Sequence, residues 1–233
     1  MSGPGANIAR WEYPLKLLRV GEPGKAKPDR PRTKAPEQRR EEILDAAQRL
    51  FLEQGIGQTT IEHITMGADV AKGTFYLYFK SKDELRSALG ERFGRNHLRR
   101  IKTAMGRQAH KDWRGKLAAW VGASVAFYLD SIQLHDVLFY EGLSPTREGL
   151  VDNVLIDCLA ELLRDGAAEQ AWFVDDARSA AVFVFSGIHG VVDDAYSKEK
   201  RGNRNRLVRR LERLCFAIVG LERDQPDWKG APD

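Results

Sequence analysis

The segment from Thr59 to Lys82 carries hydroxyl and ammonium groups at a spacing that suits the binding of a polyanion. Lys72 can donate to the acceptors of guanine or to a phosphate, and the methyl group of Thr74 can contact the methyl group of thymine. Gly73 stands between them and has no side chain, which allows close approach to base edges. The other candidates are expected to contact phosphates without reading base sequence: Tyr76, Tyr78 and Lys82 through their side chains. Thr59 and Thr60 are candidates at a helix start whose backbone N–H groups offer another phosphate site.

A second group of chemically active side chains lies later in the chain. His189 and Asp193 are four residues apart with Asp194 adjacent, and His135 adjoins Asp136, as in some metal or hydrolytic sites. No HExxH, CxxC or Gly-x-Ser-x-Gly pattern accompanies them. We therefore expect no metal, no cofactor and no enzymatic activity, and a metal-dependent enzyme is the least favoured alternative.

The elements that must position the first group are short helices. The spacing of Ile43, Ala47, Leu50 and Phe51 predicts a helix that ends at Gly55. A second helix is expected to start at Thr59-Thr60 because threonine is a good N-cap. A tight turn around residues 68–70 then leads to a third helix over about residues 72–79, which completes a helix-turn-helix unit.

The ends of this unit have recognisable residues. Ser81 is expected to cap a fourth helix, in which Asp83 and Glu84 occupy the first turn and which extends to about residue 109. Asp69 in the turn tolerates left-handed dihedral angles better than most residues. Ala71 cannot cap the third helix, and a lost cap costs about 1 kcal/mol.

This combined pattern resembles the TetR family of bacterial regulators. The resemblance rests on the helix pattern Ile43–Gly55, on Thr59-Thr60, on Ile64…Ala68-x-Val70, on Lys72-Gly73-Thr74-Phe75-Tyr76-x-Tyr78-Phe79, and on Lys82-x-Glu84-Leu85. It implies an all-helical homodimer with an N-terminal DNA-binding head and a C-terminal domain that binds a small molecule. Thr65, Asp69 and Ala71 depart from the residues usual in the family.

The expected fold class is therefore all-α, with an N-terminal three-helix helix-turn-helix head and a C-terminal helical ligand-binding and dimerisation domain. The expected domains are a basic arm (1–36), the DNA-binding head (37–82), the ligand-binding and dimerisation domain (83–224) and a tail (225–233). The arm carries eight Lys/Arg against three Asp/Glu, in a chain of net charge +4. Such an arm suits a nucleic acid partner, and the alternative is a solvated tail.

Helices are predicted in the second domain at about 113–130, 132–141, 146–165, 175–197 and 203–221. Two of them mix apolar bulk with a few polar groups, as small-molecule pockets do. The candidate pocket residues are Trp120, Phe127, Tyr128, His135 and Phe139. They favour an apolar or aromatic effector, and the alternative is ordinary core packing.

The last two helices have the composition of a dimer interface. Small residues over 180–192 allow close helix approach, and two helices from each subunit would form a four-helix bundle about a two-fold axis. The candidate interface residues are Phe183, Ser186, Gly187, Gly190, Leu211, Leu214 and Ile218.

Other features indicate the cellular setting. Cys158 and Cys215 lie in apolar helical patterns, which indicates buried free thiols in a reducing cytoplasm. The longest apolar run, 180–192, is shorter than the roughly 20 residues that span a bilayer, so no membrane partner is expected. The sequence predicts a cytoplasmic, ligand-responsive, sequence-specific transcriptional regulator, namely a repressor that a small molecule releases from a palindromic double-stranded DNA operator. The main alternative is a sequence-independent architectural DNA-binding protein.

Overall fold

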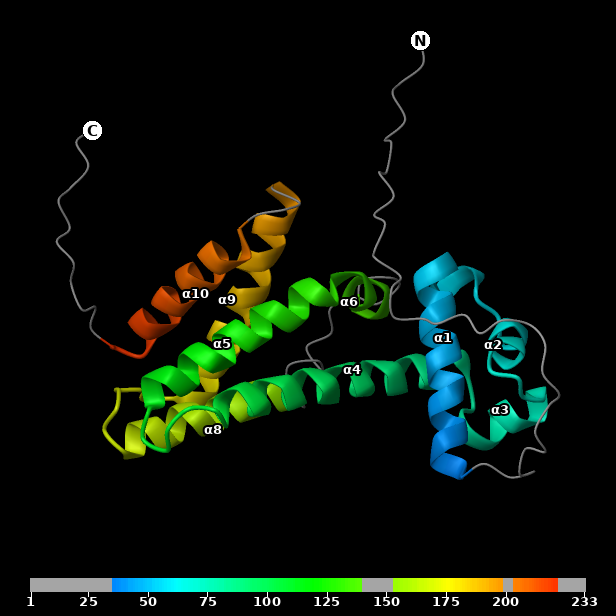
Figure 1. The fold of residues 1–233 in the computed structure, drawn as a ribbon, viewed down its shortest axis with the longest axis horizontal. Helices are drawn as coiled ribbons and strands as arrows, with labels where there is room; N and C mark the ends of the chain where they lie inside the picture. The colour runs from blue at the N-terminus through cyan, green and yellow to red at the C-terminus, as the bar shows by residue number, and fades with distance from the viewer. Residues whose placement is uncertain (1–34, 140–152, 199–202, 222–233) are drawn as a thin grey trace, which may run out of the picture. The chain divides into compact units, whose positions relative to one another are not determined.

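A computed structural model describes residues 35–139, 153–198 and 203–221. These residues form α-helices and no β-strand, which confirms the predicted all-α class (Figure 1). The helices are α1 Pro36–Gln58, α2 Ile61–Gly67, α3 Lys72–Tyr78, α4 Lys82–Met105, α5 Trp113–Asp130, α6 Ile132–Phe139, α8 Val154–Ala168, α9 Ala177–Lys198 and α10 Arg204–Ile218. The described residues from Pro36 onward form one compact unit.

Local side-chain chemistry sets the boundaries of the first helices. Gly55 has φ 79° and kinks α1, as its predicted place at a helix end requires, although one further turn follows it. Thr60 caps α2, where its Oγ1 accepts from the backbone N–H of His63 at 3.2 Å. Ser81 caps α4 by accepting from the backbone N–H of Glu84 at 3.1 Å.

The turn between α2 and α3 follows the sequence prediction. Asp69 has φ 54°, the left-handed conformation that aspartate tolerates better than most residues. Ala71 is the N-cap residue of α3 and provides no side-chain hydrogen bond. The first turn of α3 therefore keeps backbone N–H groups without a capping side chain.

The first helices enclose a small hydrophobic core. Ile43, Phe51, Ile64 and Phe75 are completely buried in it. The same cluster continues into later helices through Phe93, Phe127 and Leu138. The head and the rest of the unit are therefore joined by a shared core, and the domain boundary at residue 82 stays a prediction.

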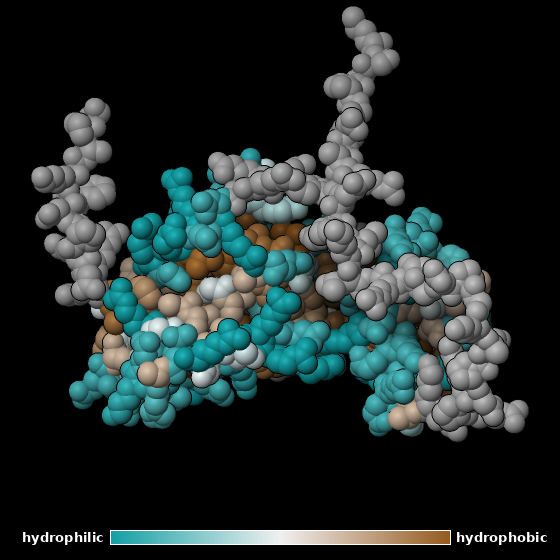
Figure 2. Space-filling model, viewed as in Figure 1, coloured by the Kyte–Doolittle hydropathy of each residue, from teal (hydrophilic) through white to brown (hydrophobic). Residues whose placement is uncertain are grey.

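A second core forms among α5, α8, α9 and α10. Trp120 and Tyr128 of α5 are nearly inaccessible within the described part of the chain. Trp172 follows α8, and its Nε1 donates to the carbonyl of Leu163 at 2.7 Å. Figure 2 shows apolar side chains gathered over α5 and α9 and hydrophilic side chains along α4.

Helix α4 connects the two cores. At 24 residues it is about 36 Å long, and it packs against α1 near its start and against α5 and α8 beyond. Arg92 fixes the first half to α1, because its guanidinium contacts Glu41, Asp45 and Gln48 at 2.9, 2.7 and 2.8 Å. The first half of α4 is thereby held to the head.

Some helix boundaries differ from those predicted. α4 ends at Met105 and not near residue 109, because Gly106 and the turns after it close the helix. α8 begins at Val154, where Asn153 accepts from the backbone N–H groups of Leu155 and Ile156. The predicted helix end at 141 and the predicted helix start at 146 lie outside the described residues. No described helix is by itself long and apolar enough to span a membrane, and α5 with α6 would suffice only when counted together across a 77° bend.

Candidate nucleic-acid interface and effector site

One face of α3 is buried and the opposite face is open. Phe75 is completely buried, whereas Tyr76 is 48% and Leu77 81% exposed. Lys72 and Gly73 are exposed at the start of the helix, while Thr74 and Tyr78 are half-buried at the sides. Five of the predicted DNA contacts thus lie on one short helix, namely Lys72, Gly73, Thr74, Tyr76 and Tyr78.

The packing of the head does not require a glycine at position 73. A Cβ atom placed there would meet nothing within 4 Å. Since glycine in a helix costs about 1 kcal/mol relative to alanine, some other demand must favour it. Close approach of another molecule to the start of α3 is such a demand.

Lys72 is engaged with α2 in this structure. Its Nζ lies 2.5 Å from Oε1 of Glu62, and both side chains are more than half exposed. The pair raises the pKa of Lys72 and lowers the pKa of Glu62, in each case chiefly through the hydrogen bond between them. An exposed pair of this kind contributes little to stability, so Lys72 can exchange its carboxylate for another anion at low cost.

Two predicted phosphate contacts have structural roles, and this corrects the sequence interpretation. Thr59 is completely buried, and its Oγ1 donates to the carbonyl of Gly55 at 2.8 Å. Lys82 donates from Nζ to the carbonyls of Ile56 and Thr59 at 2.7 and 2.9 Å. The Thr59 side chain cannot reach a phosphate, and Lys82 closes the connection between α1 and α2. Thr60 remains exposed, with its hydroxyl used as the α2 cap.

The structure also adds two surface residues that the sequence interpretation missed. Met66 in α2 is 79% exposed and Leu77 in α3 is 81% exposed. Leu77 stands between Tyr76 and Tyr78, so it belongs to the open face of α3. The sequence contains a signal for the exposure of Leu77: it lies two residues after Phe75, and residues two apart in a helix face different directions.

Comparison with known proteins identifies the head. Residues 43–89 match the family described as "Bacterial regulatory proteins, tetR family". This segment is therefore recognised as a TetR-family segment. The HTH-type transcriptional regulator SrpR of Pseudomonas putida is 27% identical over 128 residues, which make up 55% of this chain and 57% of SrpR. The chain thus spans little more than half the length of this relative.

Solved structures extend the likeness beyond the head. The fatty acid degradation regulator FadR from Bacillus halodurans is 28% identical with a TM-score of 0.62, over 82% of this chain and 98% of FadR. FadR from Bacillus subtilis in complex with stearoyl-CoA has the same TM-score at 22% identity, over 78% of this chain and 99% of that one. The TetR-family fold therefore covers most of the chain.

Beyond the head, four of the five predicted pocket residues lie together. Phe93 of α4 is at the centre, with its ring centroid 5.0 Å from Phe127, 5.8 Å from Phe139 and 6.0 Å from His135. Tyr128 lies 4.6 Å from His135. The fifth predicted residue, Trp120, belongs to the separate core among α5, α8, α9 and α10 and has no ring contact with this group among the described residues.

Two further histidines, which the pocket prediction did not include, complete this group. His97 stacks on Phe127 at 4.3 Å, and His189 lies 5.8 Å from His135. Burial lowers the pKa of His97 to about 3 and that of His135 to about 4, and it also lowers the pKa of His189. All three imidazoles are therefore neutral at neutral pH.

The same region contains both satisfied and unsatisfied polar groups. Tyr128 donates its hydroxyl to Oδ1 of Asp193 at 2.7 Å. His97 Nε2 and Ser124 Oγ are buried and have no hydrogen-bond partner in the described part of the chain. Buried polar atoms without partners are few in native proteins and call for a water or a ligand. Within the described ranges, no group of three or more His, Cys, Asp or Glu side chains is arranged to hold a metal ion.

Six of the seven predicted dimer residues are exposed on α9 or α10. Phe183, Leu214 and Ile218 are 66%, 46% and 36% exposed. Ser186, Gly187 and Gly190 lie on α9 outside its buried stripe. Leu211 is only 2% exposed and packs into the chain's own core, so its assignment to the interface is corrected.

Proposed function

We propose that this chain is a ligand-responsive, sequence-specific transcriptional regulator that binds a palindromic operator as a homodimer and is released by a small molecule. The observation that carries the proposal is the open face of α3, set on a completely buried Phe75 within a segment that matches the tetR family. A sequence-independent architectural protein would bind DNA without needing a base-reading helix or an internal polar site.

In the proposed complex, α3 lies in the major groove and α2 crosses the phosphate backbone. Lys72 would leave Glu62 for a guanine or a phosphate, and Gly73 would allow the backbone of α3 to approach the bases. The Tyr76 and Tyr78 hydroxyls would contact phosphates, which position the helix without reading sequence.

The homodimer proposal rests on the exposed apolar residues of the last two helices. Phe183, Leu214 and Ile218 present large side chains to solvent, and a Cβ atom added at Gly187 would meet nothing within 4 Å. Large apolar side chains beside small residues allow two helices to approach closely. Two copies of α9 and α10 would then form a four-helix bundle and place two copies of α3 about a two-fold axis.

The proposed effector site is the group around Phe93, His97 and His135. Its aromatic rings favour an apolar or aromatic ligand, and the partnerless His97 Nε2 and Ser124 Oγ provide hydrogen bonds for one uncharged polar group. The similar FadR from Bacillus subtilis was solved with stearoyl-CoA, so acyl-CoA esters are reasonable first compounds to test.

The proposed signal passes through α4 and α6. Phe93 and His97 belong to α4, whose first half Arg92 holds to α1, and α6 packs directly against α1. A ligand that moves these helices would move the head with them. Ligand control requires that the ligand bind more tightly to one arrangement of the heads than to the other.

The test is selection of binding sites from random DNA by the full-length protein. We expect an enriched inverted repeat, and we expect Lys72→Ala to lose base preference at one position of each half-site. Glu62→Gln is the matched variant, because it removes the carboxylate that holds Lys72 and should raise operator affinity. Selection without an enriched repeat would favour the architectural alternative.

Effector control is tested on the operator obtained in that way. Fluorescence anisotropy of the labelled operator is followed while stearoyl-CoA and a panel of aromatic compounds are added. A releasing compound should lose its effect in Phe93→Ala, whereas Phe173→Ala, at an 81% exposed position outside both the aromatic group and the proposed dimer surface, should respond normally. A compound that binds the protein and leaves operator affinity unchanged is not the effector.

A further inference from the structure

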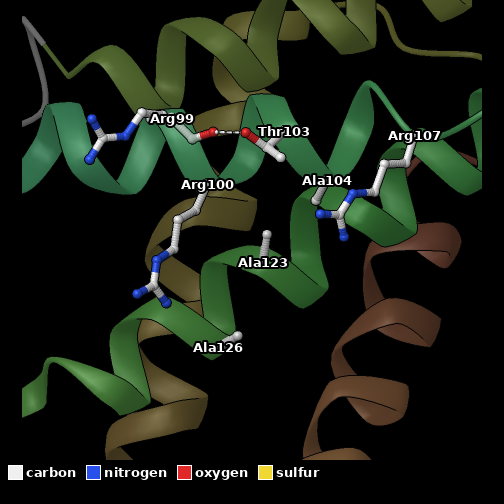
Figure 3. Close-up of a pocket in the computed structure, with 7 residues that line it drawn as sticks. All are labelled: Arg99, Arg100, Thr103, Ala104, Arg107, Ala123 and Ala126. Carbon is white, nitrogen blue, oxygen red and sulfur yellow. Dashed lines mark hydrogen bonds between the residues drawn. The ribbon is translucent and has the colours of Figure 1, made fainter. Parts of the chain in front are cut away.

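An open groove between α4 and α5 has no part in the function proposed above. Its volume is about 400 Å³. Figure 3 shows α4 contributing the charged wall and α5 contributing small side chains. The lining residues are Arg99, Arg100, Thr103, Ala104, Arg107, Ala123 and Ala126.

The groove carries an excess of positive charge. Arg100 lies 3.4 Å from a carboxylate oxygen of Asp130, and Arg204 of α10 lies 3.0 Å from the other oxygen of the same residue. One carboxylate therefore faces two guanidinium groups. Within the described ranges, neither Arg99 nor Arg107 lies within 4.0 Å of a carboxylate, so at this place the arginines outnumber their counter-charges.

Arg100 is held in position before any ligand arrives. Its guanidinium lies over the ring of Phe127 at 5.3 Å in addition to its contact with Asp130. Figure 3 shows the Arg100 side chain extending toward Ala126 and the Arg107 guanidinium turned back toward Ala104. The two guanidinium groups thus lie on opposite sides of Ala123. A guanidinium that is already positioned, such as that of Arg100, loses less entropy on binding an anion.

The floor of the groove is apolar. It consists of the methyl groups of Ala104, Ala123 and Ala126, and larger side chains at these positions would fill it. A phosphate or carboxylate fits the arginines, and an apolar group fits the alanines. A nucleic acid backbone would use the arginines and leave the alanines without a role, so the groove suits a small amphipathic molecule better.

We propose that this groove binds a small amphipathic anion, with its phosphate or carboxylate held by Arg107 and its apolar part on Ala104, Ala123 and Ala126. Such a ligand bridges α4 and α5. Because Arg92 joins α4 to the head, occupation of the groove changes the affinity for the operator. The binding step is independent of DNA, whereas this regulatory step rests on the proposed function.

The binding step is tested by calorimetry on the full chain with octyl phosphate as the probe. Octanol and inorganic phosphate are the two half-ligands, and both should bind at least tenfold more weakly. Arg107→Gln should weaken octyl phosphate binding about tenfold, as expected for loss of one charge-assisted hydrogen bond. Arg95→Gln is the matched control, since Arg95 lies on α4 before the groove, is exposed and pairs with Glu91 outside the groove.

A second variant acts on the floor. Ala126→Asp places a negative charge beside Arg100 and should abolish binding, and thermal unfolding checks that each variant is folded. Equal effects of Arg95→Gln and Arg107→Gln would overturn the proposal, and so would octanol binding as tightly as octyl phosphate. A third outcome would also overturn the proposal: the parent protein does not bind octyl phosphate, and Arg107→Gln weakens its binding to operator-free DNA. That result would assign the groove to nucleic acid.

The source of the anion is distinguished by vesicles. Co-sedimentation with phosphatidylglycerol vesicles that depends on Arg107 and is absent with phosphatidylcholine identifies a lipid headgroup, and its absence identifies a free amphiphile. Operator affinity is then measured with and without octyl phosphate. Binding without any change in operator affinity overturns the regulatory step, while a protein that selects no operator but still binds octyl phosphate overturns the proposed function alone.

Discussion

The head and the body, as we call the described helices after residue 82, differ in their buried polar groups, because only the body combines satisfied ones with ones that lack a partner. In the head, the buried Thr59 hydroxyl donates to a carbonyl, and Lys82 donates to two more. In the body, His97 Nε2 and Ser124 Oγ are buried without partners among the described residues. Satisfied polar groups specify one rigid arrangement, whereas partnerless ones leave a place for a ligand.

The head and the body also present different kinds of side chains on their surfaces. The open face of α3 presents single side chains on a rigid base, which suits recognition of a regular polymer. The body presents an aromatic group, an arginine-lined groove and an exposed apolar helix pair, which suit a variety of smaller partners.

The largest expected effect concerns the rigid base of α3. Phe75→Ala should lower the free energy of unfolding by about 3–5 kcal/mol, because it empties a completely buried position of the head core. Tyr76→Ala, one residue later and 48% exposed, should cost under about 1.5 kcal/mol, mostly through its edge-to-face contact with Phe75. Urea unfolding measures both. Similar losses in the two variants would mean that α3 is not anchored as described.

The next prediction concerns the buried histidines of the body. Their pKa values are about 3 for His97 and about 4 for His135 when folded, below the unfolded value near 6.5. As the pH falls below about 6.5, the unfolded chain takes up protons that the folded chain does not, so stability is lost. At pH 5 each histidine should cost about 2 kcal/mol relative to pH 7.

Thermal unfolding across pH 7 to 5 measures this effect. His97→Phe should reduce the slope of stability against pH, since it removes one buried titrating group. His110→Gln changes an exposed histidine and should leave the slope as it is. A parent protein with flat stability over this range would show that the histidines are accessible to solvent, which would remove the contrast between body and head.

A smaller effect on stability is expected at Gly166, where the core has no room for an added side chain. A Cβ at Gly166 would lie 2.1 Å from the indole of Trp172, which is itself held by a hydrogen bond to Leu163. Gly166→Ala should therefore lower the free energy of unfolding by about 1–3 kcal/mol. Gly57→Ala is the control in the head, where nothing lies within 4 Å of the added atom. A neutral Gly166→Ala would mean that Trp172 can move aside.

Much of the fold could be predicted from the sequence because its signals are local. The Thr60 and Ser81 caps, the glycine at a helix end and the left-handed Asp69 all depend on residues within a few positions. Helical periodicity also depends only on residues that are close in the sequence, and it predicts the all-α class and the bounds of α5. Local chemistry of this kind can be recognised without knowledge of the packing.

The parts that could not be predicted depend on distant contacts. Lys82 was assigned to phosphate because its partners, the carbonyls of Ile56 and Thr59, lie 26 and 23 residues away. His97 was missed because α4 is rich in charged residues, and only packing against Phe127 shows its burial. Leu211 follows the same helical spacing as the candidate interface residues of α10, yet it packs into the core among α5, α8, α9 and α10. Periodicity identifies a buried stripe but not which neighbour buries it.

The smallest expected effect concerns the N-cap of α3, which lacks a capping side chain. α3 begins after Ala71, which offers no side-chain hydrogen bond, whereas α2 and α4 begin after Thr60 and Ser81, which do. Ala71 has φ −69° and ψ 150°, the extended conformation that a capping residue adopts. A serine at this position can therefore accept from the first turn of α3 without any change in the backbone.

Ala71→Ser should raise the free energy of unfolding by about 1 kcal/mol, and Ser81→Ala should lower it by a similar amount. Urea unfolding measures the two variants side by side, and operator affinity is measured with them. Ala71 is exposed beside Lys72, so a stabilised variant that binds the operator less tightly would show that the uncapped N–H groups of α3 serve DNA. A variant without any gain in stability, alongside the expected loss in Ser81→Ala, would contradict the assignment of Ala71 as an unfilled cap.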